Sequence, residues 1–160
     1  MKCTSRQMAE GRYGHIDLAS GHWADQNKWI IMLPIPTGMF PNWKVLNYQI
    51  PVHAIACNQD VYGPLWSALQ AVKRNGLESE LKTFDGCFNI RTVRGSDLVS
   101  THSYGLAVDL NAGIEPLGSL TTHWSQGFRD CFTSSGFDWG GNFTGRKDPM
   151  HFSYAWEHRP

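Results

Sequence analysis

The 160-residue chain has no excess charge of either sign, no long apolar run and no closely paired cysteines. Its 14 Lys and Arg residues balance its 14 Asp and Glu residues, so no net field draws it to nucleic acid or to an anionic membrane surface. No run approaches the roughly 18 to 20 apolar residues of a membrane span. Residues 1–10 lack the apolar segment of a secretory signal. We therefore expect a cytoplasmic product with no nucleic-acid partner and no membrane span.

The four cysteines are far apart in the sequence, and none lies beside a histidine-containing motif: Cys3, Cys57, Cys87 and Cys131. The absence of a C-x-x-C pair argues against a structural zinc knot. We expect reduced, partly buried thiols; two disulfides are the alternative.

The length fits one domain with a substantial core. We predict an irregular N-terminal layer over residues 1–50 and a catalytic core over 51–157. Residues 1–28 are polar and are expected to be partly irregular, whereas 29–51 are rich in Pro and Trp and favour extended edge chain. Helices and short strands without strict alternation indicate an α+β fold, with a small antiparallel-rich sheet and flanking helices.

The patterns predict these elements in the core. Residues 52–57 indicate a short strand, and a helix follows, capped by Asn58 or Asp60, with Pro64 in its first turn and Gly76 at its end. Residues 81–84 and 87–94 resemble a hairpin around a turn at 85–86. A second helix is predicted over 122–135, with Trp124, Phe128, Cys131 and Phe132 inward, and strands over 106–110 and 150–154.

Two motifs carry the chemistry. Residues 100–109 read S-x-H-x(2)-G-x-A-x-D, and residues 148–151 read D-x-x-H. They supply two imidazoles and two carboxylates, which suits a catalytic zinc site with one acid left for proton transfer. Strand alternation turns Asp109 and His151 away from the bulky core residues, and a turn at Gly105 brings His102 to the same side. Pro149 favours an extended Asp148 at the strand entrance.

Both motifs, with residues 84–91 and 136–141, resemble the VanY-like zinc peptidases of family M15. This family includes D-alanyl-D-alanine carboxypeptidases, L-alanyl-D-glutamate endopeptidases and many phage endolysins. The resemblance runs from about residue 55 to 156. It implies a Hedgehog/DD-peptidase-like fold with the zinc site on the sheet.

The resemblance also implies roles for individual residues. His102, Asp109 and His151 would bind Zn²⁺, and Asp148 would act as general base and then protonate the leaving amine; the family more often has Glu here. Arg91 would hold a substrate carbonyl or carboxylate. Arg94 would face away from Arg91 on a regular strand, so we predict Arg91. Zinc held in this way keeps an open position, lowers the pKa of a water to about 7 and polarises an amide carbonyl.

Taken alone, these residues have structural interpretations: His102 as a buried core histidine, Asp148 as a bend residue and Arg91 as an ion-pairing residue. Trp139 with the following Gly-Gly pair could line the cleft or pack against the second helix. Together the motifs favour a catalytic zinc site, and the resemblance implies a zinc peptidase that acts on the peptidoglycan stem peptide. We expect a monomer. We expect a phage endolysin that accumulates in the host cytoplasm and acts on the wall after membrane permeabilisation.

We favour cleavage of the L-Ala–D-Glu bond. The first alternative, a D-alanyl-D-alanine carboxypeptidase, must hold a terminal carboxylate with a second cation. Only Lys147 is near the motifs, and alternation turns it away. An endopeptidase would profit from aromatic cleft walls, which Tyr104 and Trp139 could provide. The second alternative is a non-catalytic, zinc-stabilised wall-binding module, which would have no use for Asp148.

Overall fold

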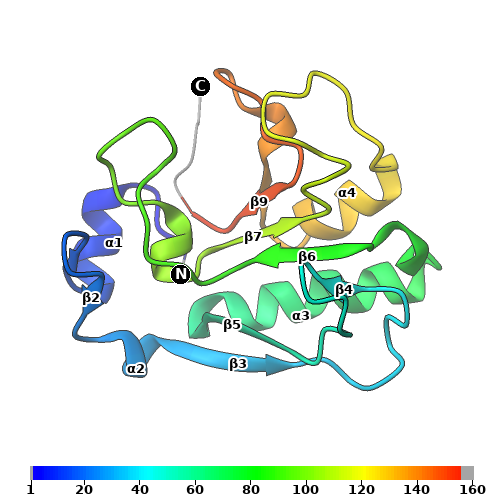
Figure 1. Cartoon of the computed structure of the whole chain (residues 1–160), viewed down its shortest axis with the longest axis horizontal. Coiled ribbons are helices and arrows are strands. Elements are labelled where there is room, and N and C mark those ends of the chain that lie inside the picture. The colour runs from blue at the N-terminus through cyan, green and yellow to red at the C-terminus, as the bar shows by residue number, and fades with distance from the viewer. Residues whose placement is uncertain (1, 156–160) are drawn as a thin grey trace.

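The structure is a computed structural model that describes residues 2–155, so the last two residues of the predicted core lie outside the described part. It confirms an α+β fold built around one five-stranded sheet (Figure 1). Its neighbours are antiparallel except the parallel pair β4–β6. In spatial order the strands are β4 (Lys44–Val45), β6 (Thr83–Gly86), β7 (Ala107–Leu110), β9 (His151–Ser153) and β8 (Asp138–Trp139).

Two smaller antiparallel sheets accompany it. One pairs β1 (Ile16–Asp17) with β2 (His22–Trp23), and the other pairs β3 (Ile30–Pro34) with β5 (Ala54–Asn58). The helices are α1 (Arg6–Tyr13), α2 (Gln26–Trp29), α3 (Gln59–Arg74) and α4 (Gln126–Thr133), with short 3₁₀ turns η1 (Glu78–Glu80), η2 (Thr101–Tyr104) and η3 (Gly140–Asn142). The predicted edge chain over 29–51 thus contains β3 and β4, and the predicted strand over 52–57 corresponds to β5.

Helix α3 forms where the sequence predicts it. The Asn58 side chain accepts a hydrogen bond from the Asp60 N–H at 3.0 Å, and the chain reverses after the left-handed Gly76. Pro64 lies inside the helix rather than in its first turn, so the helix lacks the N–H that would bond to the Asp60 carbonyl. The buried face packs against α4 and the β3–β5 sheet.

Helix α4 starts later than predicted. Ser125 caps it by accepting from the Phe128 N–H at 3.1 Å. The preceding residues stay outside the helix because the buried Glu115 carboxylate accepts from the Thr122 hydroxyl at 2.7 Å and from the His123 N–H at 2.6 Å. The side chains predicted to face inward are buried, although Trp124 precedes the helix.

The predicted hairpin is wrong. Strand β6 runs through the supposed turn at 85–86 and pairs with β7, not with residues 87–94. The Asp85 carboxylate accepts from the Ala112 N–H at 3.0 Å, which ties β6 to the end of β7. Gly86 has a φ of 134° at a register shift, so the glycine forms a bulge instead of a turn. Residues 87–94 are irregular except for an isolated bridge between Thr92 and Val99.

Residues 2–29, the first part of the predicted N-terminal layer, are more regular than expected, since Ser5 caps α1. They pack beside η2 (Figure 1). The Tyr104 hydroxyl donates to the Gly14 carbonyl at 3.2 Å, and the Trp23 ring meets the Tyr104 ring edge-on at 5.4 Å. Arg6 also donates to the Val99 carbonyl at 3.2 Å. The layer therefore supports the segment that carries His102.

All four cysteines are buried and free, as predicted. No helix within residues 2–155 is long and apolar enough to span a membrane.

Candidate metal and catalytic site

Strands β7 and β9 place two of the predicted ligands side by side. Asp109 and His151 are direct partners in the antiparallel register. Their side chains point to the same face, and His151 Nδ1 lies 2.8 Å from Asp109 Oδ1. The alternation is confirmed within the strands, because Val108, Leu110 and Phe152 are buried in the core on the other face. Met150, just before β9, was expected on that core face as well but lines the cavity.

The third residue, His102, reaches the pair from η2 through the predicted turn. Gly105 adopts a left-handed conformation with φ 65°, and its N–H donates to the His102 carbonyl at 2.9 Å. A Cβ at Gly105 would lie 2.8 Å from the Asn58 backbone nitrogen, so a larger residue does not fit. His102 Nε2 lies 3.1 Å from Asp109 Oδ2 and 3.2 Å from His151 Nδ1.

A hydrogen bond fixes the His102 ring. Its Nδ1 lies 2.8 Å from the Cys87 carbonyl oxygen, which can only accept, so Nδ1 carries a proton and Nε2 is the ring nitrogen that could bind a metal. Burial raises the pKa of the Cys87 thiol well above its ordinary value, so this side chain stays neutral. The cysteine contributes its backbone oxygen to the site.

These three residues could together hold a metal ion. One ligand atom from each lies within 4.8 Å of the others, and both histidines are buried. The closest separations are 2.8 Å from His151 Nδ1 to Asp109 Oδ1, 3.1 Å from His102 Nε2 to Asp109 Oδ2 and 3.2 Å between the two imidazole nitrogens. They involve both carboxylate oxygens, and each is close to the spacing of about 3.3 Å expected between ligand atoms that surround zinc at about 2.0 Å. Burial alone would raise the pKa of Asp109, but the charges and hydrogen bonds of His102 and His151 outweigh it and hold that pKa well below its ordinary value. Three protein ligands leave one position open.

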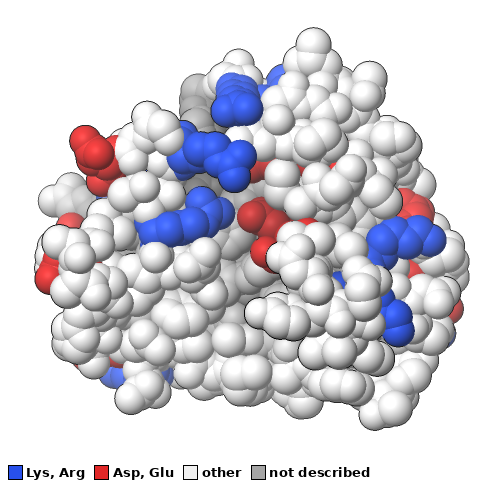
Figure 2. All heavy atoms as spheres, viewed as in Figure 1, with Lys and Arg blue, Asp and Glu red and all other residues white. Residues whose placement is uncertain are grey.

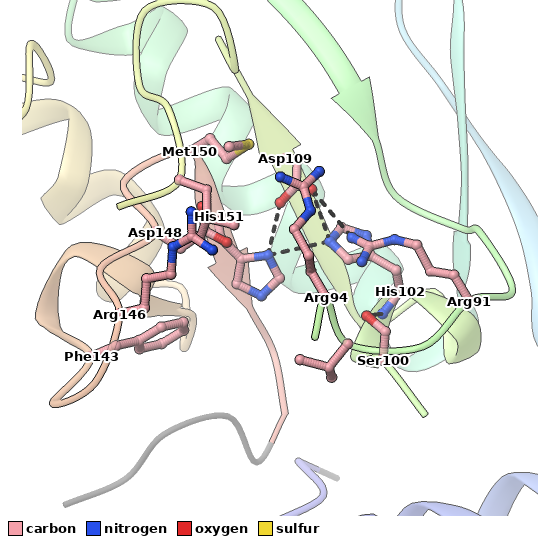
Figure 3. Close-up of a pocket in the computed structure, with 12 residues that line it drawn as sticks. Arg91, Arg94, Ser100, His102, Asp109, Phe143, Arg146, Asp148, Met150 and His151 are labelled. Atoms are coloured by element: carbon pink, nitrogen blue, oxygen red, sulfur yellow. Dashed lines mark hydrogen bonds and ion pairs between the residues drawn. The ribbon is translucent and has the colours of Figure 1, made fainter. Parts of the chain in front are cut away.

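A cavity of about 220 Å³ lies over the triad (Figure 3). Both residues predicted to act in catalysis, Asp148 and Arg91, line it. The Arg91 guanidinium Nη2 lies 3.7 Å from Asp109 Oδ2. The full lining is Arg91, Val93, Arg94, Ser100, His102, Asp109, Leu117, Phe143, Arg146, Asp148, Met150 and His151.

Asp148 stands on a tightly held turn. Its carbonyl accepts from the His151 N–H at 3.0 Å, and the Pro149 carbonyl accepts from the indole N–H groups of Trp139 at 2.8 Å and Trp124 at 2.9 Å. A Cβ on Gly140 would overlap the Asp148 carbonyl, so glycine is needed for this close approach. Trp139 thus packs and anchors the turn rather than lining the cleft.

Two expectations about charge near the site are wrong. Arg94 lines the cavity as well as Arg91, because their segment is not a strand and side-chain alternation does not apply to it. Arg146 lines it too and was not predicted from the sequence, where its position two residues before Asp148 is the available signal. Lys147 is turned away as expected, with its ammonium donating to the Phe143 carbonyl at 2.5 Å. Basic side chains lie along the left side of a hollow in the upper half of the face shown in Figure 2, and acidic atoms lie to its right.

The expected aromatic walls are also wrong. Tyr104 is 1% exposed and Trp139 is 7% exposed, and neither lines the cavity. Phe143 is the aromatic side chain that does, and it contacts His151 with ring centroids 6.0 Å apart.

Comparison with known proteins agrees with this geometry. Residues 94–154 match the family model described as D-alanyl-D-alanine carboxypeptidase. The matched range contains the three ligand candidates and Asp148, and it begins after Arg91. No curated protein and no solved structure matches the chain significantly. The family match supports a metallopeptidase that acts on peptidoglycan, and the triad gives such an enzyme a place for its metal.

Proposed function

We propose that this chain is a zinc-dependent peptidase that hydrolyses an amide bond of the peptidoglycan stem peptide. The observation that carries the proposal is the convergence of the triad, an acid and an arginine on one cavity. A purely structural zinc site is closed by four protein ligands, whereas three converge here within residues 2–155. The wall-binding module is therefore the weaker interpretation.

His102, Asp109 and His151 would hold the metal, which supplies Lewis-acid activation of the amide and a nucleophilic water at neutral pH. Asp148 would remove the proton from that water and deliver it to the leaving nitrogen. Its short side chain depends on the anchored turn at Pro149 to aim it into the cavity. Arg91 would donate to the oxygen on which negative charge develops, since it approaches the triad from the His102 side (Figure 3).

The L-Ala–D-Glu bond remains the one we propose, but for a different reason. The sequence disfavoured a carboxypeptidase because no second cation was expected near the site. That argument is wrong, because three arginines line the cavity. Three cations exceed what one terminal carboxylate needs. The fragment released by L-Ala–D-Glu cleavage carries several carboxylates, beginning with the α-carboxylate of D-Glu, whose γ-carboxyl continues the chain.

The second candidate is the terminal D-Ala–D-Ala bond. The arginines could hold its carboxylate, and the matched family is described by this activity. Digestion of purified peptidoglycan by the zinc-loaded protein, with identification of the released termini, distinguishes the two. New amino-terminal glutamate supports the endopeptidase, and free D-alanine as the sole product establishes the carboxypeptidase instead. Binding to the wall without any cleavage would favour the wall-binding module.

We also propose that the enzyme is a phage endolysin that reaches the wall once the membrane is permeabilised. The proposal rests on the resemblance of both motifs to that group. Expression in a bacterial host with and without a co-expressed pore-forming protein tests it. Lysis only when the pore is present supports it; lysis without the pore would contradict it.

A further inference from the structure

The three arginines approach the cavity from two sides. Arg91 and Arg94 come from the irregular segment before η2, and Arg146 comes from the loop that leads to Asp148 (Figure 3). Arg91 already has an anionic neighbour in Asp109. Among residues 2–155, by contrast, no carboxylate forms an ion pair with Arg146. Its charge is therefore available to a ligand.

The proposed reaction places a negative charge close to Asp148. The two candidate bonds share one chemical feature: the leaving nitrogen is bonded to a carbon that carries a free α-carboxylate. Two bonds of about 1.5 Å separate that nitrogen from the carboxylate carbon. If Asp148 protonates the nitrogen, the substrate carboxylate must lie within a few ångströms of the acid. Two anions this close repel each other unless a cation lies beside them.

Arg146 lies two residues before Asp148 and lines the same cavity. Its Nε would lie 3.3 Å from a Cβ built on Gly118, so the guanidinium rests against a backbone without a side chain. The Gly118 N–H donates to the Lys147 carbonyl at 2.7 Å, which joins the two loops beside Arg146. An exposed guanidinium supported along its side can present its N–H groups to a carboxylate in a bidentate manner.

We infer that Arg146 binds the α-carboxylate of the residue that supplies the leaving amine, and so selects for substrates with that carboxylate free. This inference rests on the proposed function. It assigns Arg146 to the leaving-group side and Arg91 to the carbonyl side. Lys147 is not a competitor, because its ammonium is held by the Phe143 carbonyl.

Amidation of the substrate carboxylate tests the inference. The zinc-loaded protein is assayed on an L-Ala–γ-D-Glu-L-Lys peptide and on the same peptide with D-isoglutamine, in which the α-carboxylate is a carboxamide. We expect kcat/KM of the wild type to fall about 10- to 100-fold on amidation, the scale of one charged hydrogen-bonded contact. Arg146→Ala should show this loss on the carboxylate peptide and no longer discriminate between the two.

Matched variants and a binding measurement complete the design. Arg146→Lys should restore part of the discrimination, and Arg74→Ala, at an exposed position on α3, should leave it unchanged. Full discrimination in Arg146→Ala, or its loss in Arg94→Ala instead, would overturn the inference. Calorimetric binding of γ-D-Glu-L-Lys and its carboxamide repeats the comparison without turnover. If neither peptide is cut but Arg146-dependent binding persists, the cleavage proposal fails and the inference stands. Loss of Arg146 dependence in both measurements refutes the inference.

Discussion

The two sides of the cavity are built differently. The ligand side rests on β7 and β9, where Asp109 and His151 lie opposite each other in the antiparallel register, with His102 fixed by the Cys87 carbonyl. On the substrate side, Arg91, Arg94, Arg146 and Asp148 all stand outside the regular elements. Strand pairing sets the distances on the first side, whereas individual side-chain contacts set them on the second. Metal binding and substrate handling should therefore respond to different mutations.

The largest effect is expected on the ligand side. His102→Ala or His151→Ala removes one of the three proposed ligands, so each should lose zinc and activity together. Metal analysis of the purified variants, beside an exposed-histidine control, His123→Ala, measures this. Activity of the wild type should also disappear with a chelator and return with zinc. Full zinc occupancy in both ligand variants would show that the metal binds elsewhere.

Asp148→Ala tests the substrate side. It should keep zinc and the fold and lose roughly 10²–10⁴ in kcat, the usual contribution of a positioned proton carrier. Asp97→Ala, at an exposed position on a nearby loop, is the control for removing a charge near the site. Normal turnover by Asp148→Ala would make this residue a bend residue only and require another acid.

Arg91→Ala should also retain zinc, with a loss of about 10²–10³ in kcat, as for removal of a donor to a developing oxyanion. Arg94→Ala should be milder, because among the cavity arginines of residues 2–155 only Arg91 forms an ion pair with the triad, 3.7 Å from Asp109. Steady-state kinetics of the two variants give the comparison. The reverse order would assign the oxyanion role to Arg94.

The smallest effect concerns the anchor of the catalytic turn. Trp139→Phe keeps the aromatic packing and removes one of two N–H donors to the Pro149 carbonyl, so we expect a loss of about 0.5–1.5 kcal/mol in unfolding free energy. Denaturant unfolding measures it, with Trp66→Phe on α3 as the control. A decrease in kcat at constant zinc content would show that the turn also aims Asp148. If Trp139→Phe behaves like the control, Trp124 alone holds the turn.

The same contrast explains what the sequence could predict. The orientation of Asp109 and His151 and the turn at Gly105 could be predicted, because strand alternation and the left-handed preference of glycine act locally. The hairpin prediction was wrong because the Asp85 carboxylate of the Asp-Gly pair accepts a hydrogen bond from the N–H of Ala112, 27 residues away along the chain. Arg146 was missed for a related reason: its place over the cavity depends on Gly118 in another loop, and no periodicity records such a contact.

The pairing of Asp109 with His151 has a consequence for how the chain reaches its native state. A slip of one residue between β7 and β9 would turn His151 to the opposite face and move it away from Asp109. Zinc would then bind only to chains with the native register, so its binding free energy would stabilise that register and no mispaired form. The ion would thus selectively stabilise chains in which β7 and β9 are aligned in the native register. Refolding with zinc should therefore yield a larger native fraction than refolding without it.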